Sequence, residues 1–408
     1  MRESMHGSRR GVAAFAPFVG PAVMASVAYI DPGNYATNFE AGARYGYALL
    51  WVMLSANVVA LLFQSLAARL GIATSKGLAE ICREQWPSPV VYLMWVAGEV
   101  AAMATDVAEF LGGSLGIGLL LHIPMLPAMA ITITLVCGLL YWDRHGFRRT
   151  EWIIAVMIGI VCLAYVVQIF FLKPDWRALG NGLVSPNLPD KQALLLAAGI
   201  VGATVMPHAL YLHAGLSGFR LGWLPKVDRD RLLRYSRWEI LAALGLAGLV
   251  NLAMTATAAS TFHKAHASPA GLEQAYRTLV PLLGSAAAGW FLLSLVASGV
   301  SSSVVGTMAG QMIMQGFVRF RVPLWVRRTV TILPSVVVVA CGVDITRALI
   351  VSQVVLSVTL PFPMVAIVWF IGQTRIMGNY AVPHVVVALA AVAAMLVIGM
   401  NVWLVLGT

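Results

Sequence analysis

The sequence predicts an all-α integral membrane protein in which two five-helix repeats are followed by an eleventh helix. Three observations lead to this prediction: a composition too apolar for a soluble protein, eleven stretches long enough to cross a bilayer, and interruptions in the first and sixth stretches. Of the 408 residues, 60% are hydrophobic and 11% are charged, and the mean hydropathy is +0.83. Because soluble proteins average about 25% charged residues, this composition is suited to lipid rather than water.

The eleven stretches are predicted to be transmembrane helices, since about 17 to 25 apolar residues cross roughly 30 Å of hydrocarbon. The first one continues past any signal-peptide cleavage pattern, so we expect it to be retained as a span. Residues 1–408 are predicted to form a single membrane domain, with repeat 1 at about 11–172, repeat 2 at about 193–370 and the extra helix at about 381–406. The predicted spans are Gly11–Ala41, Tyr45–Leu70, Val90–Leu121, Met125–Tyr141, Trp152–Leu172, Ala193–Leu221, Ile240–Thr261, Ala288–Phe317, Trp325–Cys341, Ile345–Phe370 and Ala381–Leu406.

The positive charge of the chain is predicted to reflect its membrane topology. The net charge is +10, and the Lys and Arg residues lie mostly in short connections between spans. With the N-terminus in the cytoplasm, about 20 of the 27 Lys and Arg fall on that side, as the positive-inside rule requires. We therefore expect a cytoplasmic N-terminus, an extracytoplasmic C-terminus, contact with the lipid bilayer and no nucleic-acid partner. The minimal loops suggest a bacterial inner membrane.

Two spans are interrupted near their middle by residues that a continuous apolar helix does not accommodate. The first contains Asp31-Pro32-Gly33-Asn34 and the sixth contains Met206-Pro207-His208. Proline removes a backbone donor and glycine loosens the chain, so both segments are predicted to unwind and expose carbonyl groups. Matching breaks in the first and sixth of ten spans indicate two five-span repeats, and such breaks point to the binding site of a transporter.

Polar groups at the breaks form a candidate cation site. Asp31 is an ionisable group inside an apolar span, where its cost indicates a function, although an aspartate at a kink can also simply cap a helix. Asn34 adds a neutral oxygen. Met206 adds a thioether, and soft sulfur favours transition metals over Mg²⁺ and Ca²⁺. A lone methionine more often fills a core, so the metal prediction requires Met206 to face Asp31.

Other polar residues within the spans allow more than one interpretation. His208 directly follows the second break, and histidine changes charge near physiological pH, so it could relay a proton, bind metal or serve only as a buried structural residue. Gln64 in the second span and Gln353 in the tenth face either neighbouring helices or the permeation route, and the sequence leaves both possibilities open.

A row of carboxylates in the third span suggests a proton pathway. Glu99, Asp106 and Glu109 recur at spacings of seven and three residues, which places them near one face of a helix. Carboxylates inside a membrane line ion pathways or proton relays and normally have cationic partners. Arg327 and Arg328 in the ninth span are candidate partners, or alternatively anchors on the cytoplasmic surface.

Taken together, these segments resemble a known family, the Nramp divalent metal transporters. The resemblance rests on Ala28-Tyr29-Ile30-Asp31-Pro32-Gly33-Asn34 and Met206-Pro207-His208, and it extends to segments in the second, third and tenth spans. These are Gln64-Ser65-Leu66-Ala67-Ala68-Arg69-Leu70-Gly71, Ala104-Thr105-Asp106-Val107-Ala108-Glu109-Phe110-Leu111-Gly112 and Ser352-Gln353-Val354-Val355-Leu356-Ser357.

The resemblance implies a LeuT-type inverted 5+5 repeat with discontinuous first and sixth helices, plus an eleventh helix. It also implies a metal site made by Asp31, Asn34, the Met206 sulfur and the Ala203 carbonyl, with Ala28 and Gln353 joining as the site occludes. The transported substrates would be Mn²⁺ and Fe²⁺, carried as cargo without a resident cofactor, and the protein is expected to be a monomer.

Proton coupling is a further implication of the resemblance. It assigns proton movement to Asp31, His208, Asp106 and Glu109, leading toward Arg327 and Arg328. One departure from the family pattern concerns this prediction: Ala209 stands where an asparagine usually follows the Pro-His pair. The missing polar group could alter gating, hydration of the metal or proton coupling.

Three other functions compete with import of divalent metal. A sodium-coupled amino-acid transporter of the same fold could hold a carboxylate at a broken helix, but Asp31 would repel that carboxylate. A gated cation channel lined by Asp31, Asp106 and Glu109 is a second alternative. A membrane enzyme is disfavoured because the sequence has no HExxH motif, no nucleotide-binding loop and no CxxC spacing among its four cysteines, so we expect no catalysis.

Overall fold

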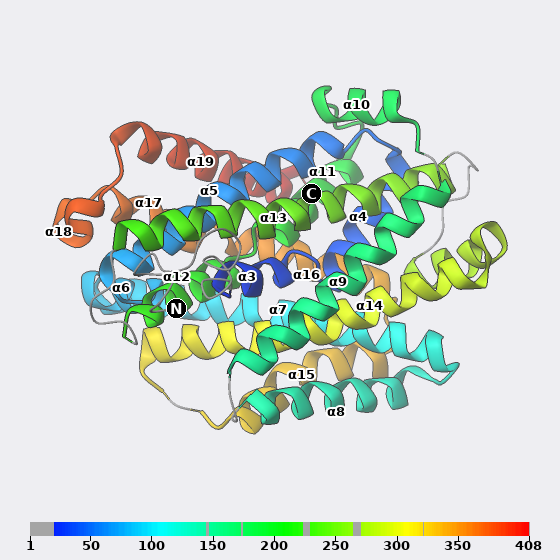
Figure 1. Ribbon diagram of the computed structural model, residues 1–408, viewed down its shortest axis with the longest axis horizontal. Coiled ribbons are helices and arrows are strands. Elements are labelled where there is room, and N and C mark those ends of the chain that lie inside the picture. Colours follow the sequence, from blue (N-terminus) through cyan, green and yellow to red (C-terminus); the bar gives the residue numbers. More distant parts are fainter. Residues whose placement is uncertain are drawn as a thin grey trace, which may run out of the picture.

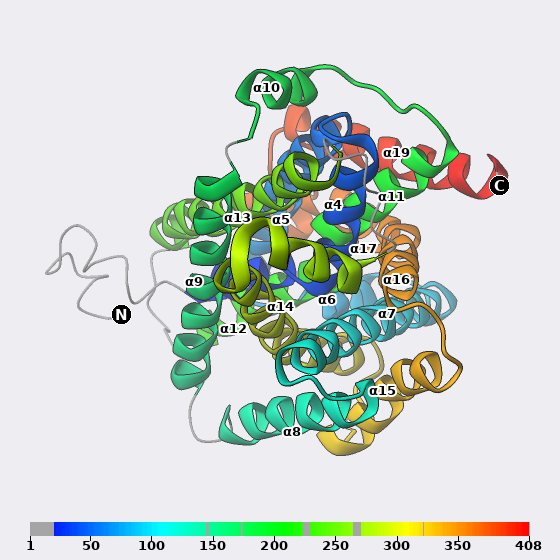
Figure 2. The same cartoon turned by 90° about the vertical axis from the view of Figure 1, so that its right-hand side faces the viewer.

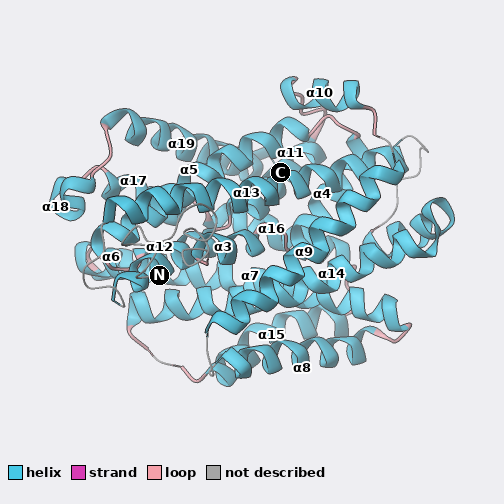
Figure 3. Ribbon diagram, viewed as in Figure 1, coloured by secondary structure: helices cyan, strands magenta, loops and turns pink. Residues whose placement is uncertain are grey.

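The computed structural model describes residues 20–407 apart from 144–146, 173, 223–228, 264–270 and 321. The described chain is built from helices, as Figure 3 shows by colour. Eight helices in this part are long and apolar enough to cross a membrane, and Met125–Tyr141 is a shorter apolar helix. Residues 11–19 of the first predicted span lie outside the described residues.

The first five predicted spans appear in the expected order, and the first is divided into two helices (Figure 1). The break is local, because α3 ends at Ala28 and α4 begins at Pro32. The helices of this half are α3 (Pro21–Ala28), α4 (Pro32–Tyr45), α5 (Leu50–Thr74), α7 (Ser88–Leu121), α8 (Met125–Asp143) and α9 (Phe147–Leu172).

The second half repeats this pattern with a divided sixth span. Here a single residue, Met206, separates α11 from α12. The helices are α11 (Lys191–Val205), α12 (Pro207–Gly222), α13 (Arg229–Ala258) with a π-helical end η2 (Ala259–His263), α14 (Leu272–Val318), α15 (Leu324–Ala340), α16 (Ile345–Thr359), α17 (Pro361–Ile371) and the final α19 (His384–Gly407).

Three features of the second half differ from the predicted spans. The seventh span was expected to begin at Ile240, but α13 begins at Arg229. The eighth span was expected to begin at Ala288, but α14 begins at Leu272 and therefore extends beyond the apolar stretch. The tenth span was expected to be continuous, but it divides into α16 and α17 at Leu360. Pro361 has no N–H to continue the hydrogen-bond ladder, whereas Leu360 keeps helical dihedral angles (φ −61°, ψ −36°), so the two helices still form one span.

Short helices connect the spans at both ends of the bundle. They are α6 (Leu78–Gln85), α10 (Trp176–Val184), α18 (Thr374–Met377) and the 3₁₀ turn η3 (Gly378–Tyr380). The segment containing α10 joins the two repeats and lies outside the bundle (Figure 2).

Close helix packing holds the first break against the third span. A Cβ atom at Gly112 of α7 would lie 2.0 Å from Cβ of Pro32 and would clash with it. On its other side, α7 packs against α14, where a Cβ at Gly299 would lie 2.7 Å from the backbone of Gly113. Small residues allow membrane helices to approach this closely. The third span is therefore fitted tightly between the first break and the eighth span.

Candidate metal site

The two breaks give different backbone geometries to the residues that flank them. Asp31 has extended dihedral angles (φ −84°, ψ 165°) and is the N-cap of α4. Met206 has a positive φ of 27°, which is uncommon for a residue with a side chain. Strained backbone of this kind is often found at functional sites and persists only where the surrounding structure enforces it. The strain at Met206 therefore marks the second break as a candidate site.

Carbonyl groups freed by the first break are bonded by side chains from two neighbouring spans. Asn251 Nδ2 in α13 donates to the Tyr29 carbonyl at 2.9 Å, and Ser298 Oγ in α14 donates to the Ile30 carbonyl at 2.5 Å. An unsatisfied carbonyl inside a membrane is costly. These two hydrogen bonds fix the break in place and leave the polar atoms of Asp31 and Asn34 for another partner.

Asp31, Asn34 and Ala203 meet in the interior, where all three are fully buried. Asn34 donates to Asp31 Oδ1 through its backbone N–H at 2.9 Å and through Nδ2 at 2.7 Å. The same Nδ2 donates to the Ala203 carbonyl at 3.0 Å and so links the two broken spans. Within the described chain, Asp31 Oδ2 and Asn34 Oδ1 have no hydrogen-bond partner. These two oxygens beside a carbonyl are ligands of the kind that divalent cations take.

Gln353 also lies beside Asp31. A Cβ placed on Gly33 would lie 1.8 Å from Gln353 Nε2 and 2.9 Å from Asp31 Oδ2, so the amide and the carboxylate flank the same glycine. Gln353 Nε2 donates to Ser352 Oγ at 3.1 Å, while Oε1 has no partner among the described residues. The tenth span therefore contributes a third open oxygen near the two breaks.

Met206 and Ala28 occupy the ends of the interrupted helices. Met206 is the residue of the second break and is fully buried, three positions after Ala203. Ala28 is the last residue of α3 and is 2% exposed. Both lie at interrupted helix ends, and their role as ligands stays a prediction.

His208 and Glu109 are buried residues with one open polar atom each. His208 Nδ1 is bonded to Thr105 Oγ1 of α7 at 3.0 Å, and in the described part of the chain its Nε2 has no partner. Glu109 lies against Gly306 of α14, where a Cβ would be 2.9 Å from both carboxylate oxygens. Its Oε2 likewise has no partner among the described atoms.

Each arginine of the ninth span bonds one carboxylate of the third. Arg328 Nη1 donates to Asp106 Oδ1 at 2.7 Å, and Arg327 Nη2 donates to Glu99 Oε2 at 3.0 Å. Arg328 also donates to the carbonyl and the hydroxyl of Ser303 at 2.9 and 2.6 Å. Both arginines are buried. They are partners of the carboxylates, not only surface anchors, and their part in proton movement stays a prediction.

A hydrogen-bond network around Tyr29, just before the first break, was not predicted from the sequence. Gln64 donates to the Tyr29 hydroxyl at 2.9 Å and is bonded to His213 Nδ1 at 2.6 Å, so this glutamine contacts neighbouring helices. Asn251, which bonds the Tyr29 carbonyl, is also bonded to Asn38 at 3.1 Å. The sequence signal that could have revealed this network was an amide side chain inside each of two apolar spans, at Asn38 and Asn251.

The polar groups at the breaks include one carboxylate and several neutral atoms. Among the described residues, no group of three or more His, Cys, Asp and Glu side chains is arranged to hold a metal ion. Asp31 is the single carboxylate beside Asn34 and Ala203 in the contacts given above.

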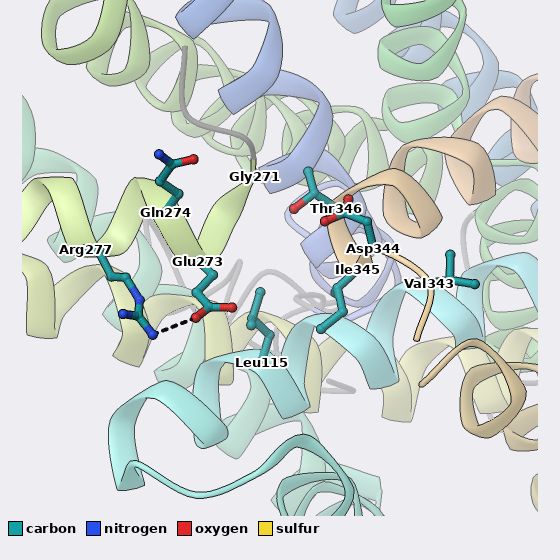
Figure 4. A pocket seen from close by; sticks show the side chains of 9 residues that line it. All are labelled: Leu115, Gly271, Glu273, Gln274, Arg277, Val343, Asp344, Ile345 and Thr346. Atoms are coloured by element: carbon teal, nitrogen blue, oxygen red, sulfur yellow. Dashed lines mark hydrogen bonds and ion pairs between the residues drawn. The ribbon is translucent and has the colours of Figure 1, made fainter. Parts of the chain in front are cut away.

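A pocket of about 320 Å³ lies away from these residues, where α7 ends and α14 and α16 begin (Figure 4). Glu273 and Arg277 form an ion pair at 2.9 Å on one side of it. Leu272 N–H donates to Thr346 Oγ1 at 3.0 Å and joins α14 to α16. The lining residues are Leu115, Gly271, Glu273, Gln274, Arg277, Val343, Asp344, Ile345 and Thr346. None of the predicted metal-site residues lines this pocket.

A helical membrane protein whose first and sixth spans break around one buried carboxylate belongs to the class of secondary transporters that bind their substrate at discontinuous helices. The family model described as "Natural resistance-associated macrophage protein-like" (Nramp) matches residues 22–407. The "Divalent metal cation transporter MntH" of Verminephrobacter eiseniae is 54% identical over 408 residues, which cover 100% of this chain and 93% of that protein. The chain therefore belongs to the Nramp family.

Solved structures agree with this assignment. A manganese transporter of Eremococcus coleocola has a TM-score of 0.86 at 30% identity, covering 96% of this chain and 87% of that one. MhsT, solved in complex with L-phenylalanine, has a TM-score of 0.62 at 14% identity, covering 93% of this chain and 98% of that one, and so shares the fold alone. These matches confirm the predicted LeuT-type fold.

Proposed function

We propose that this protein imports divalent transition-metal ions, Mn²⁺ and Fe²⁺ among them, by alternating access, with H⁺ as the coupled ion. The observation that carries the proposal is the meeting of Asp31, Asn34 and the Ala203 carbonyl at the two breaks, with open oxygens on the first two residues. Membership of a family whose named relatives are divalent metal cation transporters supports it.

The proposed metal shell uses Asp31, Asn34, Met206 and the Ala203 carbonyl. The ion would be bound by the open Asp31 and Asn34 oxygens, and the hydrogen bond from Asn34 to Ala203 would give way as the ion takes the carbonyl. Ala28 and Gln353 would complete the shell as the site occludes. The ligands come from both halves of the first span (Ala28 of α3, Asp31 and Asn34 of α4), from the end of α11 (Ala203 and Met206) and from the tenth span (Gln353). Relative movement of these helices would open the site to one side at a time.

The coupled proton is proposed to leave the site through the third span. His208 lies beside the second break and is bonded to Thr105, one residue before Asp106. Asp106 is bonded to Arg328, and Glu99 to Arg327, so ionisable groups continue along α7 toward its N-terminal end. The open Oε2 of Glu109 offers an intermediate position for the proton. Asp31, His208, Glu109, Asp106, Glu99, Arg328 and Arg327 form the proposed pathway.

Purified protein in proteoliposomes tests this function directly. We expect saturable Mn²⁺ uptake together with acidification of the interior, reported by an internal pH dye. Protein-free liposomes provide the background. Uptake without acidification would remove H⁺ from the proposal and keep the metal carrier, whereas linear, non-saturating uptake at channel rates would replace the carrier with a gated channel.

Selectivity is expected to depend on Met206. Mg²⁺ and Ca²⁺ prefer oxygen ligands, so a thioether in the shell penalises them more than it penalises Mn²⁺. The Met206→Ala variant should keep Mn²⁺ transport and admit Ca²⁺ at least about tenfold better relative to Mn²⁺. Competition of Mn²⁺ uptake by added Ca²⁺ measures this ratio. Unchanged Ca²⁺ competition would remove the sulfur from the proposed selectivity filter.

The membrane orientation is proposed from charge. A cytoplasmic N-terminus places most Lys and Arg on the inner side of the membrane, where anionic lipid favours them, and the C-terminus is then extracytoplasmic. We propose a monomer in the inner membrane that acts as a carrier without catalysis and takes the metal as cargo, not as a cofactor.

A further inference from the structure

The half-helices α4 and α11 carry ligands of the proposed metal site and lie antiparallel along one another. Near the site, Asn34 of α4 bonds the Ala203 carbonyl of α11. One turn further out, a Cβ on Gly199 would lie 3.1 Å from Thr37 Cγ2, so the helices are in close contact there. The contacts thus move toward the start of α11 as they move toward the end of α4. The two half-helices are packed along their length.

A hydrogen bond joins the same two helices at their other ends. The hydroxyl of Tyr45, the last residue of α4, donates to Asp190 Oδ1 at 2.6 Å. Asp190 is the N-cap of α11, and the same Oδ1 accepts from the Ala193 N–H at 2.7 Å. The Asp190 side chain therefore caps the start of α11 and also bonds the last residue of α4. We call the Tyr45–Asp190 hydrogen bond the outer contact.

The electrostatics at the outer contact agree with a charged hydrogen bond. The bond from Tyr45 holds the pKa of Asp190 below its usual value. This shift corresponds to a phenol donating to an ionised carboxylate, and such bonds are stronger than neutral ones.

The connection between the repeats adds further contacts around the outer contact. This segment, with α10, passes over the outer ends of α4 and α11 in Figure 2. A Cβ on Gly182 of α10 would lie 2.2 Å from the Tyr47 carbonyl, and Trp51 Nε1 donates to the Asn187 carbonyl at 3.2 Å. Asp190 is thus held in place by the connecting segment that precedes it as well as by α4.

We propose that Tyr45 and Asp190 are positioning residues for metal binding, and that the outer contact fixes the distance between Asn34 and the Ala203 carbonyl. The inference rests on the proposed function. From Tyr45 to Asn34 the helix α4 spans about 16 Å, so a rigid attachment at the outer end restricts how far the ligands can separate at the inner end. Ligands that are held in place before the ion arrives bind it more tightly.

The Tyr45→Phe variant removes the donor and keeps the ring. We expect the KM for Mn²⁺ uptake in proteoliposomes to rise about fivefold, with the maximal rate within about twofold of the parent. Tyr47→Phe is the matched control, because the Tyr47 hydroxyl contacts Ser260 and the Asp175 N–H and not α11. The control should keep the parental KM.

A second substitution tests whether the two residues act through one another. Asp190→Ser keeps an N-cap for α11 but has a shorter side chain. We expect it to raise KM in the parent and to change KM by less than about 1.5-fold when Tyr45→Phe is already present. Three results would each overturn the proposal. These are effects of the two substitutions on KM that add fully, an unchanged KM in Tyr45→Phe, or an equal rise in KM in Tyr47→Phe.

Hydrogen exchange separates this proposal from the proposed function, because it needs no metal. Exchange at the first turn of α11, around Ala193, should rise in Tyr45→Phe and stay unchanged in Tyr47→Phe. If the parent shows no Mn²⁺ uptake but the two variants still differ in hydrogen exchange, the transport proposal is refuted and the coupling of the half-helices is retained. Equal exchange in both variants would refute the coupling.

Discussion

Replacement of Asp31 by alanine is expected to reduce Mn²⁺ uptake more than about 100-fold, a larger loss than the roughly 10- to 100-fold typical of removing an outer-shell residue from a metal site. Asp31 supplies the single carboxylate in the proposed shell, and its Oδ2 is open within the described structure. Without it, neutral oxygens and a thioether would have to replace the water shell of a dication. Uptake of radioactive or dye-reported Mn²⁺ into proteoliposomes measures the loss.

The helix-capping role of Asp31 requires its own control, because the same side chain bonds the Asn34 N–H at the start of α4. Asparagine is as good an N-cap as aspartate and lacks the charge. Asp31→Asn should therefore keep the parental melting temperature and still lose uptake. Asp175→Ala removes an aspartate N-cap from α10, away from the breaks, and should transport normally. Full uptake by Asp31→Ala would remove the metal-site assignment.

The breaks were predictable from sequence because their causes are local. Proline and glycine dictate where a helix loses its hydrogen bonds, and Pro32, Gly33 and Pro207 lie at the positions where α4 and α12 begin. The same reasoning missed the division at Leu360, since Pro361 stood within a long apolar stretch with no polar residue beside it. A proline alone predicts a lost hydrogen bond; a proline with Asp or His beside it also indicates a site.

Pairing between distant segments was only partly predictable. The arginines of the ninth span were expected to meet the third-span carboxylates because buried charges need partners, and Arg328 does bond Asp106. Which arginine meets which carboxylate depends on how two helices lie along each other, which composition does not specify. The outer contact joins residues 145 positions apart, both at helix ends with ordinary polar surroundings, so no local pattern marked it.

The extended start of α14 escaped prediction for a related reason. Hydropathy locates the part of a helix that lies in lipid, and α14 begins at Leu272, well before the apolar stretch. Its first turn is held by the bond from the Leu272 N–H to Thr346 of α16 and by the ion pair of Glu273 with Arg277. One contact with another helix and one ion pair within α14 therefore hold this boundary, and the contact with α16 is visible only in the structure.

Arg328→Gln is expected to destabilise the protein by about 3–5 kcal/mol, because it leaves the Asp106 carboxylate buried without its cation. Asp106 is 6% exposed and bonds Arg328 at 2.7 Å, while Glu99, the partner of Arg327, is 16% exposed. The corresponding Arg327→Gln change should therefore cost less. Thermal unfolding of the detergent-solubilised proteins measures both, and we expect a fall of at least about 5 °C for Arg328→Gln.

The double variant Arg328→Gln with Asp106→Asn separates two effects: the loss of stability caused by an unpaired buried charge, and the role of the Arg328–Asp106 pair in transport. It removes both charges and keeps groups that can hydrogen-bond, so most of the lost stability should return, since an unpaired buried charge is the main cost. If the pair also lies on the proton pathway, the stable double variant should take up Mn²⁺ with much less acidification than the parent. A double variant that unfolds as readily as Arg328→Gln would show that the guanidinium acts mainly through Ser303, whose carbonyl and hydroxyl it also bonds. A stable double variant with parental acidification would leave Asp106 and Arg328 with a structural role and move the proton route to His208 and Glu109.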